Sequence, residues 1–221
     1  MAKVTWSHTS LKDFEGCPRR YHEVKILKKY PFVETDATRY GNELHKAAEN
    51  FVKDGMALPK QFEFIQPTLD ALMKKPGRKL AELKMALRED LSVTTWFAKD
   101  VWVRGMADLL IIDDDNLTAW VVDYKTGNNK YPDRDQLRLM SIMVMAHFPH
   151  IREVKSALLF VVKEDMVKMA MSVDEAEGEW WKYRERVGRI AAAMDNGVFN
   201  PNRSPLCGWC PCTGCEFHKE H

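Results

Sequence analysis

The sequence predicts a mixed α/β domain from the order of its elements. Apolar residues recur at helical spacing in the first part of the chain, a run of strand-like segments follows, and a helix then separates these from two more strands. This order is typical of a central sheet flanked by helices. We expect a single domain over residues 1–221, with an N-terminal helical part (1–79), a core (80–172) and a C-terminal helix and cysteine-rich tail (173–221).

The composition suits such a domain and excludes some classes of protein. The chain has 221 residues, of which 45% are hydrophobic and 29% charged, enough to bury a substantial core. The net charge of +1 is mild evidence against a protein that coats DNA, although it allows a local basic groove. There is no apolar run of about 18 residues and no secretion signal, so we expect a cytoplasmic protein without a membrane span.

Three helices are expected in the N-terminal part. The first ends near Pro18, because proline favours a helix boundary or a new first turn. Thr38–Val52 has apolar residues at helical spacing, and Pro67–Lys74 is a short helix with its proline in the first turn. The candidate N-caps of the first helix are Ser7, Thr9 and Ser10.

The central part alternates in the manner of strands. Asp133–Phe148 interrupts it as a helix, and a long helix runs from Val173 to about Asn196. The acidic linker 113–116 favours a hairpin turn over a calcium loop, because it lacks the glycine and distal glutamate of an EF-hand. The expected strands are Leu80–Arg88, Trp96–Val103, Gly105–Ile112, Leu117–Tyr124, Val154–Val162 and Met166–Met171.

Two of these strands carry the residues around which the chain is organised. Asp123 and Lys125 stand two apart at the end of an apolar run, so their side chains share one face of the sheet. Asp108 lies at the mouth of the preceding strand. Two carboxylates and a lysine on neighbouring strands form a hard oxygen site for a divalent cation with a cationic group beside it.

Two other groups of residues are less specific by themselves. His45 shares a helix face with Gly41, and a lone histidine on an apolar face is more often a core residue than a ligand. Arg19 and Arg20 beside Tyr21 either form a solvated face or contact phosphate and base in DNA.

Four of the five cysteines crowd near the C-terminus, and Cys17 stands alone. In a chain without a secretion signal this pattern favours metal ligation over disulfides. The four are Cys207, Cys210, Cys212 and Cys215.

The ordered set of motifs resembles the PD-(D/E)XK nucleases of the RecB-like exonuclease group. The motifs are Gly41-x3-His45, Gly105-x2-Asp108, Asp123-Tyr124-Lys125-Thr126-Gly127 and Gln136 in the next helix. The flanking cysteines are similar to those of the iron–sulfur subgroup, which includes CRISPR-associated exonucleases. The resemblance implies a restriction-endonuclease-like core.

The resemblance also implies roles for single residues. Asp108 and Asp123 would be metal-binding carboxylates, His45 an additional metal ligand, and Lys125 the lysine that orients the attacking water or stabilises developing charge. Gln136 would contact DNA. The family often has a tyrosine one turn after this glutamine, where this chain has Met140. Glu82 either matches an acid on the first core strand of some members or is a solvated strand residue.

For the cysteines, the resemblance implies a 4Fe–4S cluster held by Cys17, Cys207, Cys210 and Cys215, with Cys212 as the spare thiol. The last gap is one residue shorter than is usual in the family. The alternative is a local zinc site of Cys207, Cys210, Cys215 and His218. If Cys17 is a ligand, the site ties the C-terminal tail to the first helix.

The resulting functional hypothesis is a DNA exonuclease that uses magnesium or manganese and acts at single-stranded or frayed ends, in recombination, repair or DNA processing. One alternative is a CRISPR-adaptation-type or structure-specific endonuclease, working with recombination or CRISPR partner proteins. Another is a non-catalytic DNA-binding or assembly protein. A prokaryotic or phage origin would suit such a small nuclease, and the oligomeric state stays open.

Overall fold

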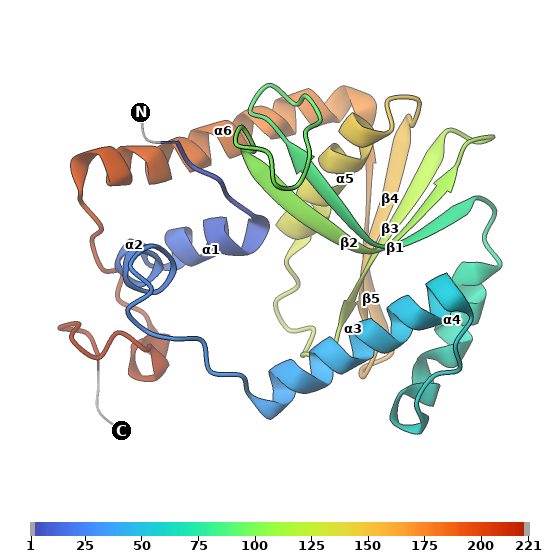
Figure 1. Ribbon diagram of the computed structural model, residues 1–221, viewed down its shortest axis with the longest axis horizontal. Helices are drawn as coiled ribbons and strands as arrows, with labels where there is room; N and C mark the ends of the chain where they lie inside the picture. Colours follow the sequence, from blue (N-terminus) through green and yellow to red (C-terminus); the bar gives the residue numbers. More distant parts are fainter. Residues whose placement is uncertain (1–2, 219–221) are drawn as a thin grey trace. The chain divides into compact units, whose positions relative to one another are not determined.

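The computed structural model, which describes residues 3–218, is an α/β protein with a five-stranded mixed sheet flanked by helices (Figure 1). This confirms the predicted fold class. The chain forms two compact units, one of residues 34–180 and one of residues 1–33 with 181–221. The predicted division of a single domain at residues 79 and 172 stays a prediction.

The sheet has the strand order β1-β2-β3-β4-β5. All neighbouring strands are antiparallel except β3 and β4, which are parallel. A parallel pair needs a crossover connection, and helix α5 (Arg134–His147) provides it. The strands are β1 (Arg78–Leu87), β2 (Val103–Asp113), β3 (Thr118–Lys125), β4 (Glu153–Phe160) and β5 (Asp165–Ser172).

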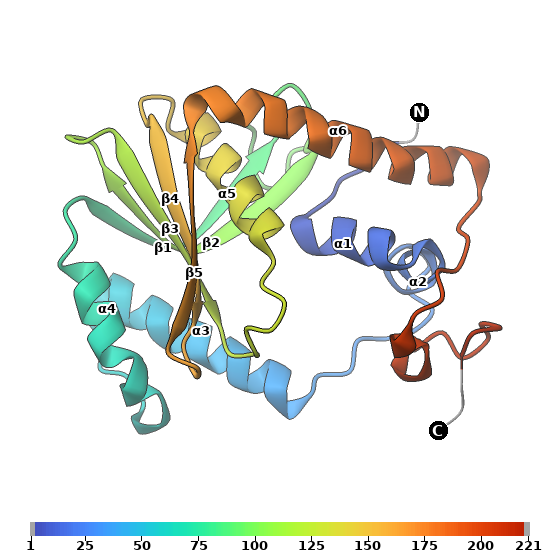
Figure 2. The same cartoon turned by 180° about the vertical axis from the view of Figure 1, so that it is seen from behind.

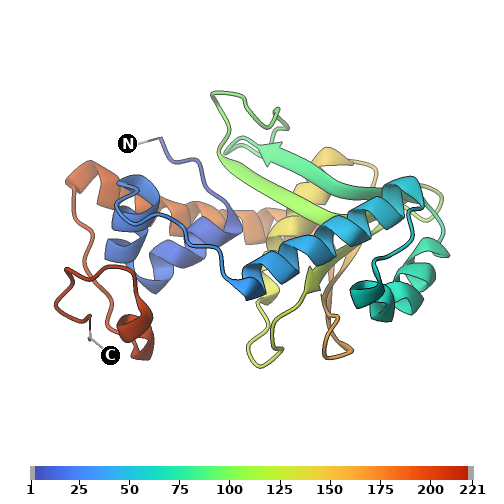
Figure 3. The same cartoon turned by 60° about the horizontal axis from the view of Figure 1, so that its bottom comes forward.

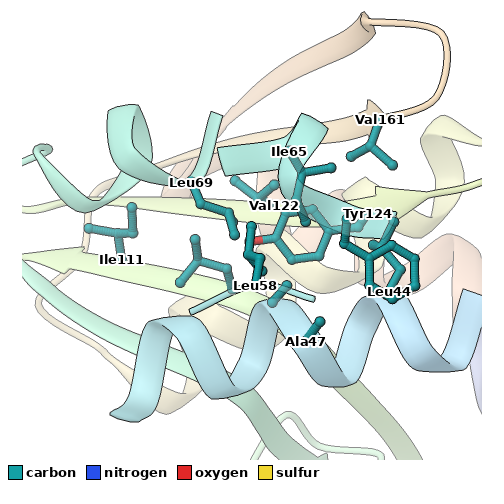
Figure 4. Packing of buried hydrophobic residues seen from close by; sticks show 12 residues of the cluster. Leu44, Ala47, Leu58, Ile65, Leu69, Ile111, Val122, Tyr124 and Val161 are labelled. Atoms are coloured by element: carbon teal, nitrogen blue, oxygen red, sulfur yellow. The ribbon is translucent and has the colours of Figure 1, made fainter. Parts of the chain in front are cut away.

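Helices cover the two faces of the sheet differently. On one face lie α3 (Asp36–Asp54), the 3-10 helix Lys60–Ile65 and α4 (Gln66–Met73), as Figure 3 shows, whereas α5 lies on the other face (Figure 2). Figure 4 shows the buried cluster that joins α3 and α4 to the sheet. Its members include Leu44, Leu58, Leu69, Ile111, Val122 and Tyr124.

Local sequence explains where α3 begins and ends and how closely α5 approaches. The Thr35 hydroxyl accepts the Thr38 N–H at 3.2 Å, and Gly55, with a φ of 64°, ends the helix in the left-handed conformation. At Gly105 in β2, a Cβ atom would lie only 2.7 Å from Sδ of Met143 in α5. Any larger residue there would need the side chain of Met143 to shift, so the glycine lets α5 pack closely on β2.

One predicted strand is wrong. Residues 96–102 form turns and irregular chain, and only an isolated Leu87–Val93 bridge extends the ladder before β2 begins. The Arg88 guanidinium donates to the Val93 carbonyl at 2.7 Å and also bonds Asp100. These side-chain bonds close the segment into a loop, which apolar alternation alone does not reveal.

The remaining elements of the predicted fold are confirmed with small shifts at their ends. The Asp113 carboxylate accepts the Asn116 backbone N–H at 3.1 Å, which makes the acidic linker a hairpin turn as expected. The last helix, α6 (Val173–Asn196), begins directly after β5. No helix within residues 3–218 has the length and apolar character needed to cross a membrane.

The other unit contains short helices that begin at polar caps. In α1 (His8–Gly16), Ser7 forms a capping box with Ser10. Cys17 caps α2 (Pro18–Tyr21), which continues as a π-helix over His22–Ile26. In the tail, a 3-10 helix spans Pro205–Trp209.

Candidate active site

The acidic residues of β2 and β3 meet on the face of the sheet that α5 covers. Because Leu109 pairs with Val122, Asp108 and Asp123 occupy adjacent positions on the two strands. Both are buried, with exposed fractions of 8% and 7%. The Lys125 ammonium lies 2.6 Å from Asp123 Oδ2. The predicted trio of two carboxylates and a lysine is therefore brought together.

Gln136, in the first turns of α5, holds the lysine and the acid in place. Its Oε1 accepts from Lys125 Nζ at 3.0 Å, and its Nε2 donates to Asp123 Oδ1. One amide group thus satisfies a charged donor and a charged acceptor at once, which fixes the relative orientation of Asp123 and Lys125.

His45 reaches the same acids from α3. Its Nε2 lies 3.0 Å from the Tyr124 carbonyl, which can only accept, so Nε2 carries the hydrogen. Its Nδ1 lies 3.3 Å from Asp108 Oδ2, and that oxygen also accepts the Tyr124 N–H at 2.8 Å. In the neutral ring, the Nδ1 lone pair would face a carboxylate, and a cation between them would satisfy both groups.

Glu82 completes a group of donors that the sequence left undecided. It stands opposite Asp108, since Ala81 pairs with Leu109 and Leu83 with Ala107. Donor atoms of His45, Glu82 and Asp108 all lie within 4.8 Å of one another. Asp123 is not part of this group. His45 Nδ1 and Asp108 Oδ2 are 3.3 Å apart. Two ligands of a magnesium ion at right angles are about 3.0 Å apart, so this pair has the spacing of two ligands of a small divalent cation.

The electrostatics of the site also favour a cation. Burial, followed by the charge of Asp108, raises the pKa of Asp123 to about 6, although Lys125 and His45 oppose the shift. Burial and then Asp108 also raise the pKa of Glu82. Burial acts to lower the pKa of His45, but the hydrogen bond to Asp108 and the surrounding acids raise it overall. The site therefore has uncompensated negative charge.

Met140 occupies the position where the resembled family often has a tyrosine. It is buried, and its Sδ would lie 3.1 Å from a Cβ at position 105. The side chain therefore fills the space between α5 and Gly105 and contributes packing instead of a polar group.

The residues expected to contact DNA near the N-terminus have structural partners. Arg19 lies 2.8 Å from the Glu216 carboxylate and donates to the Gly214 carbonyl at 2.8 Å, while Arg20 pairs with Asp13 at 2.7 Å. Tyr21 is buried, with its ring edge-to-face against Phe14. The contact of Tyr21 with a base stays a prediction, and its ring is covered by the protein.

All five cysteines line one cavity of about 380 Å³. Cys17 Sγ accepts backbone N–H groups of Arg20 at 3.5 Å and Asn202 at 3.4 Å, and Cys207 Sγ accepts that of Ser204 at 3.3 Å. All five are free thiols. Thiols converging from opposite ends of the chain fit a thiolate-bound metal group.

Three further features of this cavity concern its other donors. Burial, followed by the neighbouring Cys210, raises the pKa of the Cys212 thiol to about 12. His218 also lines the cavity, and its Nδ1 is buried without a hydrogen-bond partner among the described residues. Within residues 3–218, no three of these thiol and imidazole donors lie within 4.8 Å of one another.

Comparison with known proteins identifies the class to which this fold and site belong. The family model of the PD-(D/E)XK nuclease superfamily matches residues 5–216. The chain belongs to the PD-(D/E)XK nuclease superfamily, as its motifs predicted. The narrower assignment to the RecB-like, CRISPR-associated group stays a prediction.

The comparison with solved structures includes two matches that cover most of this chain. One is named "Putative exonuclease" from Eubacterium rectale, with a TM-score of 0.52 and 15% identity over 94% of this chain and 87% of that chain. The other, SSO0001, has a TM-score of 0.49 and 16% identity over 98% of this chain and 87% of that one. Among curated proteins, none matches this chain.

Proposed function

We propose that this chain is a metal-dependent deoxyribonuclease that hydrolyses phosphodiester bonds at DNA ends. The observation that carries the proposal is the convergence of His45, Glu82 and Asp108 within 4.8 Å, next to an Asp123–Lys125 pair held by Gln136. A binding module has no need of a buried carboxylate pair with a lysine beside it, because burying these charges is costly.

Each of these residues has a distinct part in the proposed reaction. His45, Glu82 and Asp108 would hold a divalent cation, with Asp123 at its side. Such an ion would polarise the phosphate and make water a better nucleophile. Lys125 keeps an ammonium group 2.6 Å from Asp123, where it can orient the attacking water and stabilise charge on the phosphate. Gln136 fixes the lysine for that role.

The donor set supports manganese as well as magnesium. A histidine nitrogen among carboxylate oxygens suits manganese, whereas magnesium prefers oxygen ligands and retains several waters. We therefore propose that manganese supports the higher activity, although both ions fit the site.

The loop between β3 and α5 supports contact with single-stranded DNA. It leaves the site at Lys125 and returns to it at Gln136, and these two side chains bond at 3.0 Å. Within it, Tyr131 is 83% exposed and Lys130 lies 5.4 Å from its ring. An exposed aromatic ring beside a cation is a platform for stacking a base and pairing a phosphate.

For the cysteine cavity, we propose a 4Fe–4S cluster bound by Cys17, Cys207, Cys210 and Cys215. A tetrahedral zinc site holds its four donors about 3.8 Å apart. Among the described residues of this cavity, no three thiol and imidazole donors lie within 4.8 Å of one another. This spread supports the larger cluster over zinc. The buried His218 nitrogen is the observation that favours zinc.

The decisive experiment uses anaerobically purified protein and DNA labelled at one end. Single-stranded and double-stranded substrates are incubated with manganese, magnesium or a chelator. Lys125→Ala is compared with Lys74→Ala, which changes an exposed lysine at the end of α4. We expect metal-dependent shortening from one end, retained in Lys74→Ala and lost in Lys125→Ala. The name of the Eubacterium rectale protein agrees with this exonuclease option.

Other outcomes would favour the alternatives. Internal cuts with the same metal and lysine dependence would indicate a structure-specific or CRISPR-adaptation-type endonuclease. Binding of DNA without cleavage, by folded protein in either metal, would overturn the catalytic proposal and indicate a binding or assembly role.

A further inference from the structure

A large cavity of the sheet unit lies away from the candidate active site, on the opposite face of the sheet. It is a groove of about 1120 Å³ between α4 and the strands β3, β4 and β5. Alternation places Ala157 and Leu159 of β4 on this face, with Lys168 and Met166 of β5 paired beside them. Asp123 and Lys125 alternate to the other face, so the groove does not belong to the active site.

The floor of the groove is apolar and incompletely covered. It is formed by Trp120, Ala157 and Leu159, which are half-buried, and at its sides Phe64 and Met166 are 45% and 44% exposed. A contiguous apolar strip on a central sheet is typical of a surface that another element covers.

The helices on this face indicate which kind of element would fit the groove. On this face, α3 and α4 pack over β2 and β3 through the cluster that contains Leu69, Ile111 and Val122. The helical layer ends at α4 (Figure 3). Residues of α4 line one side of the groove. A helix is about 10 Å in diameter, so one further helix beside α4 would continue the layer over β4 and β5.

The charged side chains at the rim of the groove indicate which charge a bound helix would carry. Lys75 lies beyond the end of α4 with its ammonium 5.0 Å from the Trp120 ring, and Lys155 and Lys168 project from β4 and β5. The acids of the lining, Glu164 and Asp165, are confined to the β4–β5 turn and the start of β5. A further acid, Glu153, lies 3.1 Å from Lys155 on the same face of β4. Lys75 and Lys168 therefore give the rim the positive charge that complements glutamates and aspartates flanking an apolar stripe.

We propose that this groove is a docking site for an acidic amphipathic helix of a partner protein. The helix would place apolar residues at i, i+3, i+4 and i+7 on Trp120, Ala157 and Leu159, with acidic residues toward Lys75 and Lys168. The site is independent of DNA cleavage, because its residues lie on the face opposite Asp123 and Lys125.

The test is a selection from a peptide library in which the charge of the peptide is not fixed in advance. A library of 18-residue helical peptides with a fixed apolar stripe and flanks randomised among Glu, Lys, Ser and Gln is selected on the full-length protein. We expect enrichment of Glu in the flanks. Selected peptides should bind about tenfold more weakly to the double variant Lys155→Glu/Lys168→Glu, whose exposed side chains are changed without loss of packing. Lys28→Glu/Lys60→Glu carries the same charge change elsewhere and should bind normally.

The position of the bound peptide is checked by methyl NMR of the methionines. The Met166 methyl resonance should shift, whereas that of Met143, which is fully buried in α5, should not. Selection of Lys-rich or neutral peptides, equal binding by the double variant, or an unshifted Met166 would each overturn the proposal. Two other outcomes would overturn it in favour of a different occupant: oligo(dT) competing with the peptide, or self-association of the protein that the double variant abolishes.

Discussion

Removing the charge of Asp123 should stabilise the metal-free protein while damaging the site. The folded pKa of Asp123 is raised to about 6, against about 3.9 in an unfolded chain. A raised folded pKa contributes stability that is present below the unfolded pKa and lost as pH rises through the folded pKa. The loss between about pH 4 and pH 7 corresponds to about 3 kcal/mol as an upper value. Asp123→Asn keeps the shape of the neutral acid but cannot ionise, so its free energy of unfolding should not fall in this way as the pH rises.

The assay is urea-induced unfolding in the presence of EDTA at pH 4.5 and pH 8. The variant should be more stable than the wild type at pH 8, by up to about 3 kcal/mol, and nearly equal to it at pH 4.5. Asp113→Asn is the matched control, because Asn116 lowers the pKa of this buried acid and its loss should destabilise the protein. A variant at position 123 that is less stable at pH 8, or whose advantage does not change with pH, would refute the reasoning.

Four further predictions concern the site and its support. Lys125→Ala should reduce the rate of cleavage in single-turnover assays by about a hundredfold or more. Urea unfolding at pH 8 should show that the variant remains folded. His45→Ala should weaken manganese binding more than magnesium binding, measured by calorimetry, and equal losses would argue against a ligand role. Tyr131→Ala should weaken binding of single-stranded oligonucleotides by about tenfold in fluorescence anisotropy and leave metal binding unchanged. Gly105→Ala should cost about 1–3 kcal/mol in urea unfolding, since its Cβ would meet Met143, and a neutral result would mean that the methionine adapts.

The sequence predicted the centre of the site well for a definite reason. Asp123 and Lys125 are two apart on a strand, and strand periodicity alone places them on one face. Their pairing with Asp108 follows from a short hairpin between β2 and β3, which is a local feature. His45 lies 79 positions from its partner Tyr124, and only the resemblance to a family indicated its role.

Other features depend on information that periodicity does not contain. Glu82 has a φ of 52°, and this unusual backbone conformation in β1 is invisible in the alternation of side chains. The contact between Arg19 and Glu216 spans 197 positions, so an exposed arginine could not be told from a paired one in the sequence. Trp96–Val103 has the composition of a strand, but Arg88 bonds Asp100 inside this segment and Val93 before it, and these bonds hold the segment as a loop.

The residue between the acid and the lysine serves the site without its side chain. The Tyr124 N–H binds Asp108 and its carbonyl binds His45, while its ring points into the core on the opposite face. Every amino acid except proline has both backbone groups, so the residue type at position 124 does not reveal this function. Any residue other than proline that fits the core at position 124 would still connect the two ligands. The part of the site that joins them therefore has no signature in the amino-acid sequence.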